Sequence, residues 1–120
     1  MRERLVPPDD ISPTDFFTAW VPDAVARDPA RSGRLGHAAH DLEFTLEGEG
    51  GGIFGVHIQG GAVRGSVGPI ESPDLRIRLD VPTWRALNRG EMSAPEAFLK
   101  RKVHLHGSLV LAVKLHVILG

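Results

Sequence analysis

Hydrophobic and polar residues alternate along most of the middle of the chain. Over residues 40–47, Leu42, Phe44 and Leu46 alternate with charged residues and threonine, which predicts a half-buried strand. The same period of two recurs at residues 54–58, 63–67, 75–80 and 103–105. Glycine runs separate the first three stretches, and glycine permits the tight turns of hairpins. The pattern predicts five strands, of which the first three form an antiparallel meander within residues 40–68.

Helical spacing marks the segment before the first strand. Ser12 followed by Pro13 is typical of a helix start, because serine caps the first turn and proline fits its first position. The aromatic residues at positions 16, 17 and 20 have the spacing of one buried helical face. Pro22 is expected to break or kink this helix before it continues through Val25.

Two shorter helices are predicted between the fourth and fifth strands. Asp80 supplies an N-cap for the first helix, and Gly90 stands where a helix-ending glycine belongs. Residues 93–96 have the spacing of a capping box for the second helix, because a serine precedes a glutamate by three positions.

The last predicted helix, after Gly107, is apolar on nearly every side. Between residues 109 and 119 only Lys114 and His116 are polar, so the apolar surface exceeds a single stripe. Such a helix needs a ligand, the sheet or another subunit to cover it. We therefore expect its inner side to form a cavity wall and its outer side, with Val110, Val113 and Val117, to be available for a homodimer contact.

Each predicted strand has one apolar and one polar face, so the helices are expected to cover a single side of the sheet. The predicted fold class is α+β, with the order helix, three strands, crossover, strand, two helices, strand, helix. Residues 1–11 carry charges and two adjacent prolines and are expected to form a flexible lead-in. Residues 12–120 are expected to form one domain.

Composition narrows the class of partner. Lys and Arg number 14 and Asp and Glu 15, so no net field attracts nucleic acid. The chain has no cysteine, no signal-peptide pattern and no apolar run long enough to span a membrane. We expect a cytoplasmic protein without thiolate metal sites.

Several short motifs follow one another in a particular order along residues 13–119. They comprise Gly48 and the glycine-rich hairpin after it, Gly60-Gly61, Gly68, Ser72-Pro73-Asp74, Trp84 through Leu87 to Gly90, Ala97-Phe98, and Val103 through Gly107 to Leu111-Ala112 and Leu115. This ordered set resembles the sterol carrier protein 2 family, in the form of a stand-alone bacterial domain. Where that family usually has an acidic or amide residue before the last helix, this chain has Ser108, whose hydroxyl can still cap.

The resemblance implies a mixed five-stranded sheet, helices on one face, and an apolar tunnel between the layers. It implies carriage of a fatty acid, a fatty acyl-CoA, or a sterol-like or quinone-like lipid, with no catalytic motif, cofactor or metal. The residues expected to line the tunnel are Phe54, Val56, Ile58, Leu79, Trp84, Phe98, Leu109, Ala112 and Leu115. The basic trio Lys100, Arg101 and Lys102 is either a site for an anionic head group or a solvated turn.

Two other classes of function stay open. The domain can be an interaction or accessory module for a lipid- or quinone-modifying enzyme, with the last helix as the contact. It can also be an enzyme on a hydrophobic metabolite that uses His57 or the pair His104 and His106. By alternation all three imidazoles are expected on the exposed polar face of the sheet, which favours a surface role over catalysis or metal binding.

Overall fold

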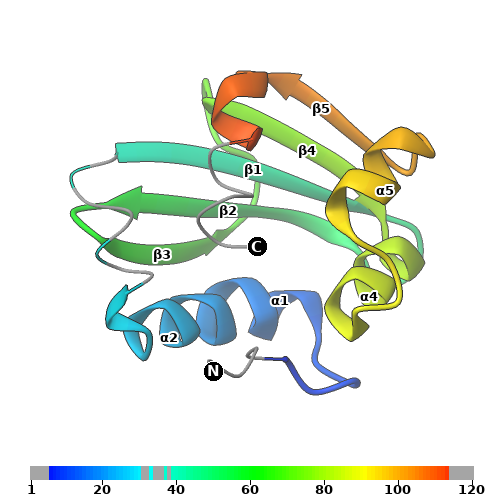
Figure 1. Ribbon diagram of the computed structural model, residues 1–120, viewed down its shortest axis with the longest axis horizontal. Helices are drawn as coiled ribbons and strands as arrows, with labels where there is room; N and C mark the ends of the chain where they lie inside the picture. Colours follow the sequence, from blue (N-terminus) through cyan, green and yellow to red (C-terminus); the bar gives the residue numbers. More distant parts are fainter. Residues whose placement is uncertain (1–5, 31–32, 34–36, 38, 114–120) are drawn as a thin grey trace.

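Five strands form one mixed sheet. The computed structural model describes residues 6–30, 33, 37 and 39–113 (Figure 1). The strands are β1 (Ala39–Glu47), β2 (Gly52–Gln59), β3 (Ala62–Val67), β4 (Leu75–Asp80) and β5 (Val103–Gly107), in the spatial order β3-β2-β1-β4-β5. β1 and β4 are parallel and the other neighbours are antiparallel. The predicted meander and the mixed five-stranded sheet are both confirmed.

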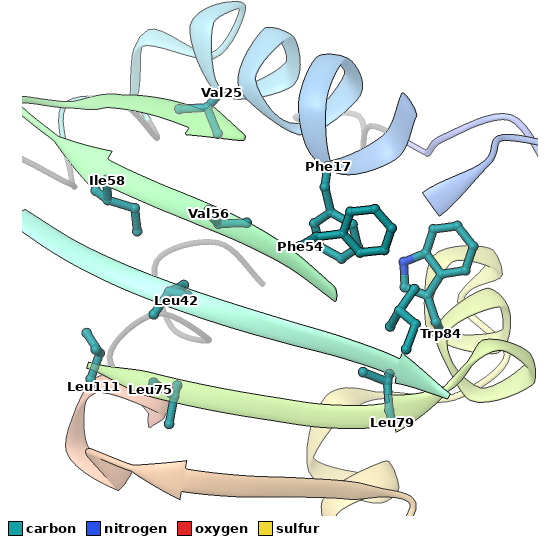
Figure 2. Packing of buried hydrophobic residues seen from close by; sticks show 11 residues of the cluster. Phe17, Val25, Leu42, Phe54, Val56, Ile58, Leu75, Leu79, Trp84 and Leu111 are labelled. Carbon is teal, nitrogen blue, oxygen red and sulfur yellow. The ribbon is translucent and has the colours of Figure 1, made fainter. Parts of the chain in front are cut away.

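Strand register gathers the apolar residues into one layer. Leu42 of β1 stands between Val56 of β2 and Leu75 of β4, and the next inward residue, Phe44, stands between Phe54 and Ile77. Because side chains on a strand alternate between faces, these cross-strand rows all lie on the same side of the sheet. That side carries the hydrophobic core (Figure 2).

The N-terminal helix packs across this apolar side, over β2 and β3 (Figure 1). It consists of α1 (Pro13–Asp15), the π-helical turn η1 (Phe16–Trp20) and α2 (Val21–Ala26). The hydroxyl of Ser12 accepts from the N–H of Asp15, as the predicted N-cap requires. Pro22 does not end the helix: the irregularity predicted there takes the form of the wide π turn directly before α2, which bends the hydrogen-bond ladder without breaking the helix.

The close approach of this helix depends on Gly65 in β3. A Cβ atom there would lie 1.9 Å from the carbonyl oxygen of Phe17, so η1 rests directly on the strand backbone. The side chain of Phe17 consequently lies in the core, where its ring stacks on that of Phe54 with the two centroids 5.0 Å apart.

Two short helices follow β4 and lie on the same side of the sheet, α4 (Val81–Arg89) and α5 (Ala94–Leu99). Asp80 accepts from the N–H of Thr83, and Gly90 ends α4 in the left-handed conformation at φ 76°. Ser93 accepts from the N–H of Glu96 at the start of α5. The predicted caps of both helices are confirmed.

Residues 6–11, the described part of the lead-in expected before residue 12, run against α4. The guanidinium of Arg85 donates to the carbonyl oxygens of Asp9 and Ile11, and Ile11 packs against the core.

Residues 109–113 are helical, which confirms the start of the last predicted helix. The hydroxyl of Ser108 accepts from the N–H of Leu111, so it caps as expected. Leu111 is buried in the core, whereas Val110 and Val113 are 80% and 65% exposed. Residues 114–120, including the predicted Leu115, lie outside the described residues.

The outer face of the sheet is not bare, although the helices cover only the inner face. The crossover between β3 and β4, residues 68–74, passes over β2 and β1 on this outer side. The N–H of Ile70 donates to the carboxylate of Glu43 at 2.7 Å, and its side chain lies over the Cα of Gly55. Glu43, on the predicted polar face, is therefore buried, and it also pairs with Arg76.

Candidate functional site

A cavity of about 450 Å³ lies between the sheet and the helices. Its floor is the apolar face of the sheet and its roof is the N-terminal helix, with α4, α5 and the helical residues 109–113 closing it. The described residues that line it are Phe16, Phe17, Trp20, Val21, Ala24, Val25, Leu42, Phe44, Val56, Leu75, Ile77, Leu79, Trp84, Leu87, Asn88, Ala94, Phe98, Val103, Leu105 and Ala112. Every strand except β3 contributes to this lining, so the cavity depends on the assembled fold.

The lining is hydrocarbon and aromatic surface almost throughout. Apart from the two indole rings, Asn88 is the only polar side chain among the described lining residues. A cavity of this size with a few polar groups is typical of small-molecule sites, in which apolar burial supplies affinity and polar groups fix orientation.

Trp84 is 4% exposed, and its Nε1 forms no hydrogen bond with any other described residue. A buried donor without a partner costs about 1–3 kcal/mol, so such atoms are rare in folded proteins. Figure 2 shows the indole nitrogen on the side of the ring turned away from α4, toward the interior where Phe17 and Phe54 lie.

The cavity reaches the surface beside α5. Phe98 lines the cavity and is nevertheless 47% exposed, which marks the position of an opening. The basic trio that follows, residues 100–102, is exposed and contributes nothing to the lining. Within the trio, Lys100 pairs with Glu96 at 3.7 Å.

Five of the nine side chains expected to line a tunnel do line the cavity, namely Val56, Leu79, Trp84, Phe98 and Ala112. Phe54 and Ile58 are core residues with 3% and 2% exposure and do not reach it. The expected position of Leu109 is corrected: it is 54% exposed, because the helical turn directs Leu111 and Ala112 inward.

Sequence reasoning missed much of the lining from β1 and β4, and it assigned the aromatic residues of the N-terminal helix to the core. Leu42, Phe44, Leu75 and Ile77 have the same inward alternation as Val56, and that signal was sufficient to include them. Alternation shows which side chains of a strand point toward the core, but it does not show whether another element fills the space above them.

His57 occupies a different site, on the outer face of the sheet. Its Nδ1 lies 2.7 Å from Oδ1 of Asp41, and its Nε2 lies 2.9 Å from Oγ of Ser66. A carboxylate only accepts, so in the neutral imidazole Nδ1 donates to Asp41 and Nε2 accepts from the hydroxyl of Ser66. The expectation of an exposed residue is corrected, since the side chain is 19% exposed.

This carboxylate–imidazole–hydroxyl chain has the connectivity of a hydrolytic triad, but it faces away from the cavity. Acyl transfer also needs donors for the developing oxyanion. The N–H of Ile70, whose side chain lies with the Ser66 hydroxyl against Gly55, is already donated to Glu43. The geometry favours a structural role, in which His57 joins the three neighbouring strands.

The other two candidate imidazoles are exposed on β5. His104 and His106 share the outer face, as alternation predicts, and stand opposite Arg78 and Arg76 of β4. Neighbouring guanidinium groups oppose the binding of a cation there.

Within the part of the chain that the structure describes, no three side chains gather as metal ligands. The described helices are also too short or too polar for any of them to cross a membrane. The cytoplasmic location stays a prediction.

Fold and cavity define a class of protein, the α+β domain with an apolar cavity between a sheet and its covering helices. The sequence matches the model of the SCP-2 sterol transfer family over residues 22–120, so the chain belongs to that family. It is accordingly an SCP-2-like lipid-binding or lipid-transfer domain. A comparison with curated proteins finds no match.

Solved structures of the same fold include larger and similar-sized proteins. A double mutant of the sec-alkyl sulfatase PisA1, an enzyme from Pseudomonas sp., matches 95% of this chain at 18% identity and a TM-score of 0.76, but the chain spans only 19% of it. The sterol carrier protein domain 2 of Helicoverpa armigera matches over 93% of this chain and 88% of its own, with 18% identity and a TM-score of 0.68. The ubiquinone synthesis protein UbiJ-SCP2 matches over 88% and 94%, with 12% identity and a TM-score of 0.65.

Proposed function

We propose that this domain carries one apolar or amphiphilic ligand in its cavity without changing it chemically. The ligand is a fatty acid, a fatty acyl-CoA, or a sterol-like or quinone-like lipid. The observation that carries the proposal is the cavity of about 450 Å³, among whose described lining residues Asn88 is the only polar side chain besides the two indoles.

Burial of the ligand's apolar surface is the driving force. Each methylene group taken out of water contributes about 0.8 kcal/mol, and the loss of translational and rotational freedom offsets roughly 4–15 kcal/mol. A chain that fills the cavity can therefore bind reversibly, as a carrier requires.

An anionic head group would lie outside the cavity. The opening is marked by Phe98, and the basic trio begins two residues later at Lys100. A carboxylate or phosphate at this opening would stay partly hydrated and gain a modest attraction from exposed cations, while its chain occupies the cavity.

The test pairs two substitutions on β5. Val103 lines the cavity, and its neighbour His104 is exposed on the opposite face. Protein purified without detergent is analysed by native mass spectrometry, then titrated with a fluorescent fatty acid. Val103→Trp is expected to lower ligand occupancy and affinity by filling the cavity, whereas His104→Trp keeps both. Equal binding by the two variants, or no lipid bound by the wild type, would contradict the proposal.

The second candidate function is an accessory module that presents a ligand to a lipid- or quinone-modifying enzyme. The similarity to one part of an alkyl sulfatase and to a ubiquinone synthesis protein supports it. So do the exposed apolar residues Leu109, Val110 and Val113 on the last described helical turn.

The accessory role predicts a specific interaction through that turn. A lipid- or quinone-modifying enzyme that co-purifies with the tagged domain is identified by mass spectrometry and then compared between the wild type and Val110→Asp. Loss of that enzyme from the variant supports the role, and equal recovery contradicts it. Light scattering at low concentration separately tests the predicted homodimer.

A further inference from the structure

The polar groups of the cavity are concentrated on α4. Trp84 and Asn88 both line it and are four residues apart, hence neighbours on one helical face. Asn88 is half-buried, whereas Trp84 is almost fully buried with an unpaired N–H. Two of the three polar side chains among the described lining residues therefore lie on α4, and the third, Trp20, lies on η1.

Among the residues that the structure describes, none accepts a hydrogen bond from the indole N–H. Phe16 and Phe17 contact the ring of Trp84, with centroids 5.2 and 6.5 Å away, but they present only π surfaces, which are weak acceptors. A trapped water would be poorly held as well, since it needs about two to four polar partners and the described walls here supply only the indole and Asn88.

The acceptor that fits this position is neutral. No cationic side chain lines the described cavity, and an ionised carboxylate is costly to bury without a partner. The nearby guanidinium of Arg85 lies 5.0 Å from the ring centroid of Trp84, but it donates to the carbonyl oxygens of Asp9 and Ile11.

We propose that Trp84 donates a hydrogen bond to a carbonyl oxygen of the bound ligand, and so selects a ketone, ester, thioester or quinone over a pure hydrocarbon. The proposal rests on the proposed carrier function and deepens it. Nε1 is fully buried in this structure, so the indole must turn for the carbonyl to reach it against α4, while the chain attached to the carbonyl extends along the apolar walls.

Two matched probes isolate the hydrogen bond. One is decyl methyl ketone, and the other is the alkene in which a methylidene group replaces the carbonyl oxygen. Their affinities are measured by displacement of a fluorescent fatty acid. Because the ketone loses more hydration than the alkene on binding, the quantity compared between proteins is the ratio of ketone affinity to alkene affinity. Trp84→Phe removes the N–H and keeps an aromatic ring, so this ratio is expected to be about 10-fold higher in the wild type than in Trp84→Phe, equivalent to about 1.4 kcal/mol.

A control variant separates hydrogen bonding from cavity shape. Val56→Ala changes an apolar wall of the same cavity and should change the affinities for both probes together, which leaves the ratio of ketone to alkene affinity at its wild-type value. A direct readout comes from the two indole N–H signals in the NMR spectrum of the wild type, since the chain has two tryptophans. The Trp84 signal is expected to move downfield with the ketone and to stay in place with the alkene. This readout holds even if Trp84→Phe fails to fold.

The outcomes are distinguishable. If the ratio of ketone to alkene affinity is the same in the wild type and in Trp84→Phe, and the Trp84 signal does not separate the probes, the carbonyl proposal is overturned while carriage of an apolar ligand stands. If neither probe binds, the carrier function itself fails, and the carbonyl proposal fails with it.

Discussion

Replacement of Gly65 by alanine tests the close packing that sets the height of the cavity roof. The added Cβ would lie 1.9 Å from the carbonyl oxygen of Phe17 and 2.8 Å from the Cα of Thr18, where ordinary contacts begin at 3.4 Å. Both obstacles are backbone atoms of η1, so no side chain can rotate away. The helix must rise by about 1.5 Å or the strand must bend.

The expected loss of stability is about 2 kcal/mol. Overpacking a well-filled site costs roughly 1–3 kcal/mol, and the rigid backbone on the opposing side places Gly65→Ala in the upper half of that range. Alanine lowers the entropy of the unfolded chain relative to glycine, which returns roughly 0.4–1 kcal/mol. A rise of the helix also separates Phe17 from Phe54, whose rings stack at 5.0 Å.

Urea unfolding followed by tryptophan fluorescence gives the change in the free energy of unfolding. Gly33→Ala is the matched control, because a Cβ there meets nothing within 4 Å. A Gly65→Ala protein as stable as the wild type would refute the close approach of η1 to β3. The same result would remove the reason for a fixed gap between the sheet and the N-terminal helix.

Three further predictions concern the ligand, the cap of α4 and the outer face. In a series of alkyl ketones, affinity measured by displacement should rise about 3- to 4-fold per methylene, from roughly 0.8 kcal/mol each, until the cavity is full, and a flat series would contradict apolar burial. Hydrogen bonds from Thr83 hold the pKa of the Asp80 carboxyl below its usual value. The cap therefore contributes its full stabilisation at any pH above the usual pKa, and this stabilisation is lost as the pH falls through the lower pKa of the folded state. Asp80→Ala should therefore cost about 1 kcal/mol in urea unfolding at neutral pH, a difference that shrinks in strong acid, and a constant difference would refute the cap. His57→Ala should destabilise the protein by about 1–2 kcal/mol with no change in ligand affinity, and fluorophosphonate should not label Ser66, whereas labelling that depends on His57 would establish a reactive hydroxyl.

The sequence alone determined which residues share a face, where the helices begin and where α4 ends. A period of two is a local property of extended backbone, so the inward side chains of β1 and β4 were identifiable without the fold. Caps are equally local: Asp80, Gly90 and Ser93 act within a few residues of their own positions. The ordered motifs also indicated the family, and the match to the family model over residues 22–120 confirms it.

Tertiary structure decided what lies above each face. Phe54 and Val56 point inward from the same strand, yet the ring of Phe17 covers Phe54 while Val56 lines the cavity. His57 has the alternation of an exposed residue, but the crossover, Asp41 and Ser66 enclose it. The unpaired N–H of Trp84 is likewise visible only in the fold, since the absence of an acceptor depends on every neighbour brought around it.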